Sequence, residues 1–140
     1  PLLFVKANPV NKKIFKILME NLLKRPKEVK KAWGKELIIE NQDYCGKILV
    51  FNPNAKFSMH FHIEKDETWY VSKGNFTLNL IDTLNAERVS LNLQQGDVFY
   101  VPTGLPHQLC AGELGGEIFE VSKHHRDEDS YRVEKGDSQL

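Results

Sequence analysis

Cysteine is scarce in this sequence. Only Cys45 and Cys110 occur among 140 residues, which excludes a small disulfide-bonded scaffold and is typical of reduced thiols. Internal repeats and low-complexity tracts are also missing. The apolar run Leu2–Val5 is far too short to cross a membrane, and no signal-peptide pattern precedes it. We therefore expect a single-domain cytoplasmic protein without a membrane partner.

The chain has no net charge, since 19 Lys and Arg balance 19 Asp and Glu, but the charges are unevenly distributed. Residues 1–35 hold ten basic side chains against two acidic ones, a balance of +8, and residues 36–140 carry −8. A basic arm could bind nucleic acid, but no aromatic interleaving or nucleic-acid motif accompanies it. We expect no nucleic-acid partner, and favour docking of this arm on the acidic part of its own chain or of a partner chain.

The basic arm contains a predicted amphipathic helix. Asn11 is a suitable N-cap, Pro26 ends the helical pattern, and Pro26–Lys31 is expected to be a charged connector with at most one further helical turn. Such a helix needs burial on its own domain or in a partner, so we expect a homodimer. The predicted apolar stripe consists of Ile14, Phe15, Leu18, Met19, Leu22 and Leu23.

The rest of the chain is predicted to be β-structure. Short segments of strand character alternate with turns rich in Gly, Pro, Asn and Asp, which is typical of a sandwich or barrel. The predicted strands are Glu36–Glu40, Gly46–Phe51, Phe57–Ile63, Glu67–Ser72, Phe76–Asp82, Arg88–Leu93, Asp97–Val101, His107–Cys110 and Glu117–Ser122.

The predicted strand from Phe57 to Ile63 alternates strictly between two kinds of residue. Its odd-numbered positions are apolar, so the even-numbered ones, which include His60 and His62, share the opposite face. Glu67 follows after a short charged turn, and a hairpin there can bring it beside the two imidazoles. Imidazole nitrogens and a carboxylate oxygen are ligands for first-row transition metals. Chance clustering of surface histidines is the alternative.

A further candidate ligand, His107, opens a later strand after a segment in which Gly and Pro turns flank a short apolar run. Together the histidines and their surroundings resemble the two motifs of the cupin superfamily. The residues that carry the resemblance are His60-x-His62-x4-Glu67-x6-Gly74 and Gly96-x5-Pro102-x-Gly104-x2-His107.

The resemblance implies an all-β fold, the cupin double-stranded β-helix or jelly-roll barrel, here with an N-terminal helix. It also implies that His60, His62, Glu67 and His107 bind one divalent metal, for which Mn, Fe, Co, Ni and Zn are all compatible. We expect three parts: a helical segment over residues 1–32 that packs on the barrel or a partner, the barrel over 33–133, and a tail over 134–140.

Two positions depart from the cupin motifs. Asn54 stands where the first motif usually has Gly, and Asn tolerates the left-handed backbone that such a turn requires. Ala111 stands where the second motif usually has Asn, which removes a supporting hydrogen bond and leaves the four ligands intact.

A narrower resemblance joins this chain to sugar-isomerase cupins, namely the D-lyxose-isomerase-like and type II mannose-6-phosphate-isomerase-like proteins. It implies a metal-dependent aldose–ketose isomerase acting on a sugar or sugar phosphate. Glu120 is the candidate base and Lys65 the candidate acid, on opposite sides of the open metal positions. The residues that carry it are Trp33-Gly34, Lys65 within the first motif, Glu67 to Val71, Glu120 to Ser122 and Asp129 to Arg132.

Alternatives remain open for these residues and for the function. Lys65 could belong to a solvated turn, Glu120 could face solvent, and His124 and His125 are expected on the surface. A cupin could also bind or sense a sugar without turnover, or act as a metal-dependent oxygenase. An oxygenase needs no proton-transferring pair beside its metal, so the pair Lys65 and Glu120 favours the isomerase.

Overall fold

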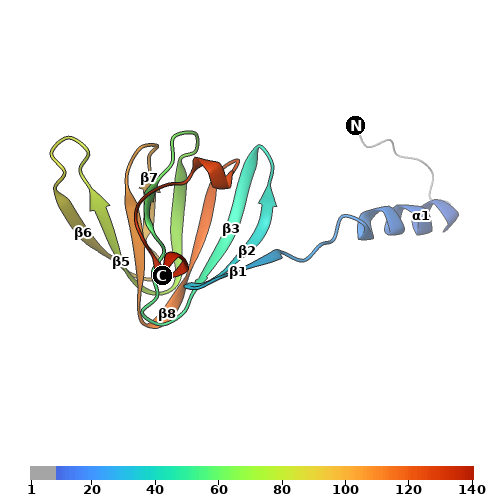
Figure 1. The fold of residues 1–140 in the computed structure, drawn as a ribbon. Coiled ribbons are helices and arrows are strands. Elements are labelled where there is room, and N and C mark those ends of the chain that lie inside the picture. The colour runs from blue at the N-terminus through green and yellow to red at the C-terminus, as the bar shows by residue number, and fades with distance from the viewer. Residues whose placement is uncertain (1–8) are drawn as a thin grey trace.

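Within residues 9–140, nine antiparallel strands form one strongly curled sheet, and one α-helix precedes it (Figure 1). The structure, a computed structural model, describes residues 9–140; the apolar run Leu2–Val5 lies outside this range. The elements in chain order are α1 (Pro9–Glu20), β1 (Lys27–Lys31), β2 (Gly34–Asn41), β3 (Tyr44–Phe51), β4 (Met59–Phe61), β5 (Glu67–Ile81), β6 (Arg88–Leu93), β7 (Val98–Val101), β8 (His107–Lys123), η1 (Asp127–Asp129), β9 (Tyr131–Glu134) and η2 (Asp137–Gln139).

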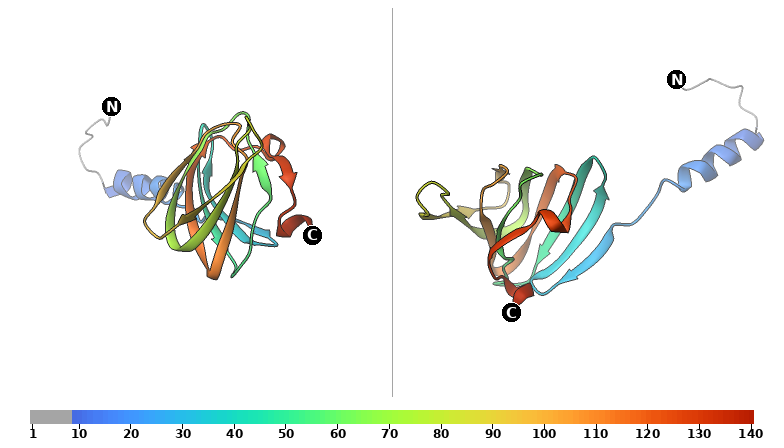
Figure 2. Two further views of the ribbon diagram at one scale, coloured as in Figure 1. Left: turned by 90° about the vertical axis from the view of Figure 1, so that its left-hand side faces the viewer. Right: turned by 45° about the horizontal axis from the view of Figure 1, so that its top comes forward.

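The long strand β8 organises the sheet. Its second half lies between β3 and β5, and its first half pairs with β5 and touches β4 where His60 lies opposite His107. The path β1-β2-β3-β8-β4-β9 is completed by β5, which also pairs with β6 and β7. The predicted all-β jelly-roll fold with an N-terminal helix is therefore confirmed, and the curl of the sheet is visible in two further views (Figure 2).

The core fills the interior of the curl with aromatic and branched side chains from every major strand. Trp33 stacks on Phe51 at 4.6 Å between ring centroids, and Trp69 lies deeper, next to the histidines. Alternation along β3 sends one side of the strand inward, as expected for period 2. The buried core residues are Trp33, Leu49, Phe51, Ala55, Phe57, Trp69, Val71, Phe76, Leu78, Leu93, Val101, Leu109, Ala111 and Ile118.

Two predicted strand breaks are bulges within continuous strands. The turn expected at Gly74 instead continues β5, with register shifts on either side of it, and β8 likewise runs through Gly115 and Gly116. Gly74 has φ +80°, and a Cβ there would lie 2.4 Å from the Gly115 carbonyl oxygen. Glycine at these positions lets the two strands bend together without separating. The predicted left-handed backbone at Asn54 is confirmed, with φ +58°.

The N-terminal segment differs from its prediction in two places. The helix begins at Pro9 rather than after Asn11 and ends at Glu20, several residues before Pro26. Residues 27–31, expected as a connector or helical turn, form β1, which pairs along its whole length with β2. The expected boundary at residue 33 therefore falls inside a hairpin, and the barrel sheet begins at Lys27.

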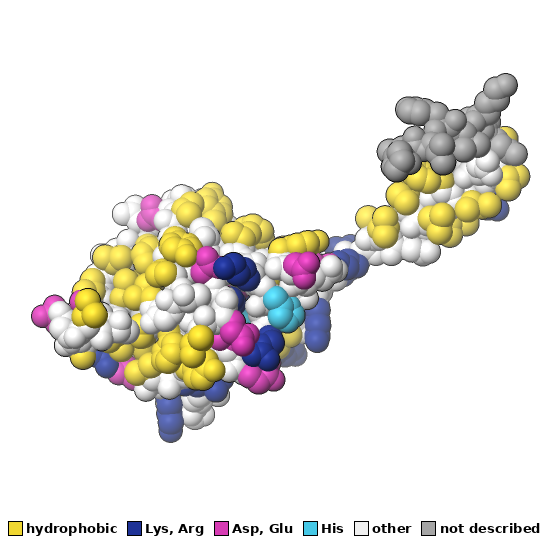
Figure 3. Space-filling model, turned by 90° about the horizontal axis from the view of Figure 1, so that it is seen from above, with side chains coloured by type: hydrophobic (Ala, Val, Ile, Leu, Met, Phe, Trp, Pro, Cys, Tyr) yellow, Lys and Arg dark blue, Asp and Glu magenta, His cyan; other side chains and the backbone are white. Residues whose placement is uncertain are grey.

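Helix α1 lies away from the barrel, and none of its residues is buried (Figures 1 and 2). Seen from above, hydrophobic side chains cover much of its surface (Figure 3). Among the described residues, no helix is long and apolar enough to span a membrane. The exposed apolar side chains of α1 and of the residues just after it are Val10, Ile14, Phe15, Ile17, Leu18, Met19, Leu22 and Leu23.

The C-terminal tail completes the barrel. β9 pairs with β4, and Tyr131 stacks on Phe61 at 5.3 Å. Tyr131 thus anchors this segment on the barrel. Asp137 accepts a hydrogen bond from the Lys56 backbone N–H at 2.9 Å, which fastens the last turn to the loop before β4.

Candidate metal centre

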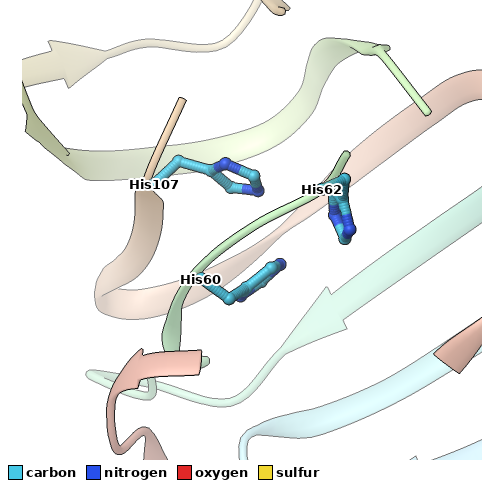
Figure 4. Close-up of side chains that lie close together, drawn as sticks. All are labelled: His60, His62 and His107. Carbon is cyan, nitrogen blue, oxygen red and sulfur yellow. The ribbon is translucent and has the colours of Figure 1, made fainter. Parts of the chain in front are cut away.

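Three imidazoles converge inside the curl of the sheet (Figure 4). His60 lies on β4, His62 follows it on the same face, and His107 opens β8 directly opposite His60. One nitrogen from each ring lies within 4.8 Å of the others, and His62 and His107 are buried. The alternation of the strand and the cross-strand pair therefore bring together the three histidines that the sequence singled out.

Backbone carbonyls determine which nitrogen of each ring is free. Nδ1 lies 2.8 Å from the Ser58 oxygen in His60, 3.0 Å from the Asp129 oxygen in His62, and 2.8 Å from the Leu105 oxygen in His107. A carbonyl can only accept, so each Nδ1 carries the proton and each Nε2 presents a lone pair. Such outer hydrogen bonds are what orient metal-binding histidines.

Electrostatics also favour neutral rings. Burial, together with the neighbouring His107 and His62, holds the pKa of His60 well below its usual value. A neutral imidazole is the form that binds a metal.

Glu67 supplies the carboxylate. Its Oε1 lies 3.1 Å from Nε2 of His107 and 3.6 Å from Nε2 of His62. Nε2 of His107 is buried and makes no hydrogen bond. Two lone-pair donors that face each other without a proton between them need a cation at this point. The residues present therefore fit one divalent transition metal, with three nitrogens and one oxygen as ligands.

Lys65 and Glu120 lie next to these ligands and are both buried. Lys65 Nζ is 3.0 Å from Oε2 of Glu67 and 3.1 Å from Oε2 of Glu120, so it bridges the two carboxylates. Neither side chain faces solvent, so the alternatives of a solvated Lys65 turn and an outward Glu120 are both excluded. They also touch each other, whereas the sequence-based expectation is that they lie on opposite sides of the metal. Lys65 follows a turn that directs it inward, and β8 alternation directs Glu120 to the same place.

This ion-pair network shifts the pKa of each member. Burial opposes the charge of Lys65, but Glu120 and Glu67 outweigh it and raise its pKa. Burial likewise opposes the charge of Glu67, yet Lys65, together with the adjacent His107 and His62, holds the pKa of Glu67 well below normal. Burial and the nearby Glu67 raise the pKa of Glu120 to about 7, despite Lys65. Glu120 is thus the carboxyl that gains and loses a proton near neutrality.

Asp129 supports the site from behind, a role that its local sequence does not predict. Its carboxylate accepts the backbone N–H groups of Ile63, Glu64 and Lys65 at 2.9–3.2 Å. Its own carbonyl accepts Nδ1 of His62. One buried residue therefore holds the turn between two ligands and the His62 ring. No local signal could have revealed a contact across more than sixty positions.

A second polar group lies further along the same cavity. Lys47 is only 2% exposed and pairs with Glu36 at 3.4 Å. His125, expected on the surface, is half-buried in the cavity wall and pairs with Asp127 at 3.0 Å. Burial and the charges of Lys47 and Lys65 lower the pKa of His125 to about 4, so its ring is neutral. In β3, Cys45, Leu49 and Phe51 point inward at every second position, and Lys47 shares this face. The alternation of the strand could therefore have predicted that Lys47 points inward.

The cavity that joins these groups has a volume of about 250 Å³. Three of the four candidate ligands, His60, His62 and Glu67, line it together with Lys65 and Glu120. Trp33, Leu49 and Trp69 supply apolar wall. The space suits a small molecule with several polar groups.

A small antiparallel jelly roll with three inward imidazoles and one carboxylate defines a class of metal-binding β-barrel proteins. The family described as Cupin matches residues 45–134, and the chain belongs to this family. The matched range contains all four candidate ligands together with Lys65 and Glu120.

Solved structures show the same fold. Oxalate decarboxylase from Bacillus subtilis at pH 4.6 superposes with a TM-score of 0.68 and 19% identity, over 77% of this chain and 30% of that one. The capsular polysaccharide assembling protein CapF from Staphylococcus aureus gives 0.72 and 14%, over 83% and 34%. This chain thus spans about a third of either protein. A comparison with curated proteins found no match.

Proposed function

We propose that this cupin is a metal-dependent aldose–ketose isomerase that acts on a small sugar or sugar phosphate. The observation that supports it is the buried ion pair of Lys65 and Glu120 beside the candidate ligand Glu67. A carboxylate is already present as a metal ligand, and metal binding alone requires neither a second buried carboxyl nor a lysine. Burying both is costly, which suggests a chemical role.

The reaction requires two proton movements. An aldose becomes a ketose when the hydrogen on C2 moves to C1 and a proton moves from the C2 oxygen to the C1 oxygen. A bound divalent ion supplies Lewis-acid stabilisation of the negative charge that develops on the two oxygens. In the proposal, Glu120 takes the proton from C2 onto a carboxylate oxygen and returns it to C1. Glu120 lines the cavity, and Lys65 alone separates its carboxylate from that of Glu67. A substrate bound at Glu67 would therefore hold C1 and C2 near Glu120.

Lys65 serves the oxygens in this proposal. Its ammonium carries three N–H donors, and the carboxylates of Glu67 and Glu120 accept hydrogen bonds from two of them. A donor directed into the cavity stabilises a substrate oxygen while its proton is exchanged. The same ammonium holds Glu120 and Glu67 at a fixed separation, which positions the base. Each such group typically contributes about 10²–10⁴-fold to the rate.

Solvent hydrogen exchange tests the proposal. Metal-loaded protein is incubated in D₂O with aldoses, ketoses and their phosphates, and deuterium at C1 and C2 is followed by NMR. We expect incorporation for at least one sugar, reduced about 100-fold or more by Glu120→Gln or Lys65→Met. Glu117→Gln, on the outer face of the same strand, is the matched control and should leave the rate unchanged. Saturable sugar binding without exchange would refute the isomerase and leave a sensing cupin.

A further inference from the structure

Lys47 is a buried cation that the proposed reaction does not use. Its side chain is 2% exposed, and within the described residues its one ion-pair partner is Glu36, at 3.4 Å. An ammonium has three N–H donors, so this contact leaves donors without a protein acceptor. Unsatisfied donors on a buried charge are costly unless something else accepts them.

The position of Lys47 puts those donors in the cavity. Lys47 lies directly opposite Glu120 in the β3–β8 register, and both line the same space. The strands are adjacent in the order β5-β8-β3-β2, so their polar side chains form a row across the sheet. This row runs from Glu67 through Glu120 and Lys47 to Glu36. Neighbouring strands are about 4.8 Å apart, so β3 lies roughly 10 Å from β5. A molecule held at the metal ligands by one end can reach Lys47 with its other end.

The partner of Lys47 decides what can bind there. Glu36 also lines the cavity, and it offers carboxylate oxygens beside the ammonium donors. A hydroxyl group both accepts and donates a hydrogen bond, so it can contact Lys47 and Glu36 together. A phosphate only accepts, and its charge would meet the carboxylate of Glu36.

We propose that Lys47 and Glu36 form a hydroxyl-binding pair that recognises the end of the substrate chain away from the metal ligands. The inference rests on the proposed function for the identity of the substrate, and it narrows that substrate to a chain with a free hydroxyl at this end. Lys47 donates a hydrogen bond to the hydroxyl oxygen, and the Glu36 carboxylate accepts a hydrogen bond from the hydroxyl group. The two residues determine specificity and take no part in proton transfer.

A purely structural role would give a different result. Removing one member of a buried ion pair leaves the other charge unpaired and costs stability. We therefore expect Lys47→Met to lower the melting temperature in either case and to keep the metal affinity, because it touches none of the four candidate ligands. Only a binding role also predicts a loss of polyol affinity. Glu36→Gln, which preserves size and keeps one acceptor, provides a second variant if Lys47→Met fails to fold.

Binding of inert open-chain polyols tests the pair without turnover. Xylitol, sorbitol and sorbitol 6-phosphate are titrated into Zn²⁺-loaded protein by calorimetry, since they carry the hydroxyls of open-chain sugars but cannot isomerise. We expect xylitol or sorbitol to bind, with the affinity reduced about tenfold or more by Lys47→Met and less by Glu36→Gln. Lys35→Met is the matched control, because Lys35 pairs with Glu28 at 3.5 Å outside the cavity and its loss should change nothing.

The outcomes separate the two proposals. Polyol binding that depends on Lys47, without solvent exchange on any sugar, supports the pair and refutes the isomerase. Exchange on a sugar whose affinity is the same in Lys47→Met refutes the pair alone. Failure of either polyol to bind wild-type protein at millimolar concentration also overturns the pair. Tighter binding of sorbitol 6-phosphate, with the gain lost in Lys47→Met, would show a phosphate site instead and overturn it as well.

Discussion

Replacing Asp129 by Ala should destabilise the protein more than any loop substitution nearby. The carboxylate accepts three backbone N–H groups from the turn 63–65, at 2.9–3.2 Å. One hydrogen bond to a charged group makes a net contribution of about 1.5–3 kcal/mol to the stability of a protein. The three bonds share one carboxylate and two donors lie on exposed residues, so we expect a combined loss of about 2–4 kcal/mol rather than the full sum.

Thermal unfolding followed by circular dichroism measures this loss. For a domain of this size about 4 °C corresponds to 1 kcal/mol, so the melting temperature of metal-free Asp129→Ala should fall by about 8–16 °C. Glu128→Ala is the control, because Glu128 is exposed on the same short helix. A melting temperature within 2 °C of the wild type would refute the idea that this carboxylate holds the turn.

Acid should remove the same contribution. Burial opposes the charge of Asp129, but the N–H groups of Glu64, Ile63 and Lys65 outweigh it and lower the pKa. A carboxyl with a lowered folded pKa contributes its full stability above the unfolded value, about 3.9, and loses it as the pH falls through the folded pKa. The stability difference between wild type and Asp129→Asn should therefore be constant from pH 5 to 8 and shrink in stronger acid.

Two other predictions concern the metal and the helix. Glu67→Gln should weaken Zn²⁺ binding at least about tenfold in a chelator competition, because a neutral amide replaces the one anionic ligand; Glu64→Gln, exposed and paired outside the site, should not. We also propose that the apolar face of α1 is buried in a homodimer, so sedimentation at micromolar concentration should give twice 16.1 kDa. Leu18→Gln should shift the protein toward the monomer, whereas Lys16→Gln, a change at a highly exposed polar side chain, should not. A monomeric wild type would contradict the proposal.

The sequence predicted the parts of the fold and site that depend on local pattern. Strict alternation placed His60 and His62 on one face, and the structure has them there with His107 beside them. Alternation also applies to Lys47, but a charged residue in a strand is normally expected to face water, so the pattern alone does not predict its burial. The sequence predicts a turn at Gly74 rather than the bulge, since glycine is typical of both and only the pairing of β5 with β8 distinguishes them.

Long-range contacts could not be predicted in this way. Nothing near Asp129 indicates that its carboxylate meets a turn more than sixty residues earlier. The segment Lys27–Lys31 has the charged composition of a connector, yet it forms β1 because β2 offers it a full set of backbone partners. Lysine-rich edge strands are common, since the charges discourage further pairing at an open sheet edge.

The three carbonyls that hold the histidine rings have a consequence for how the protein can change over time. An acceptor that belongs to the main chain survives replacement of its own side chain, so the orientation of His107 does not depend on Leu105 being leucine. His60 likewise keeps the Ser58 carbonyl if the Ser58 hydroxyl, 3.2 Å from the same nitrogen, is removed. At these two rings the supporting acceptors are therefore encoded by strand geometry, whereas the turn beside His62 still depends on the Asp129 carboxylate. Mutations can accumulate around the ligands and alter the cavity, and so the substrate, while the donor atoms keep their arrangement.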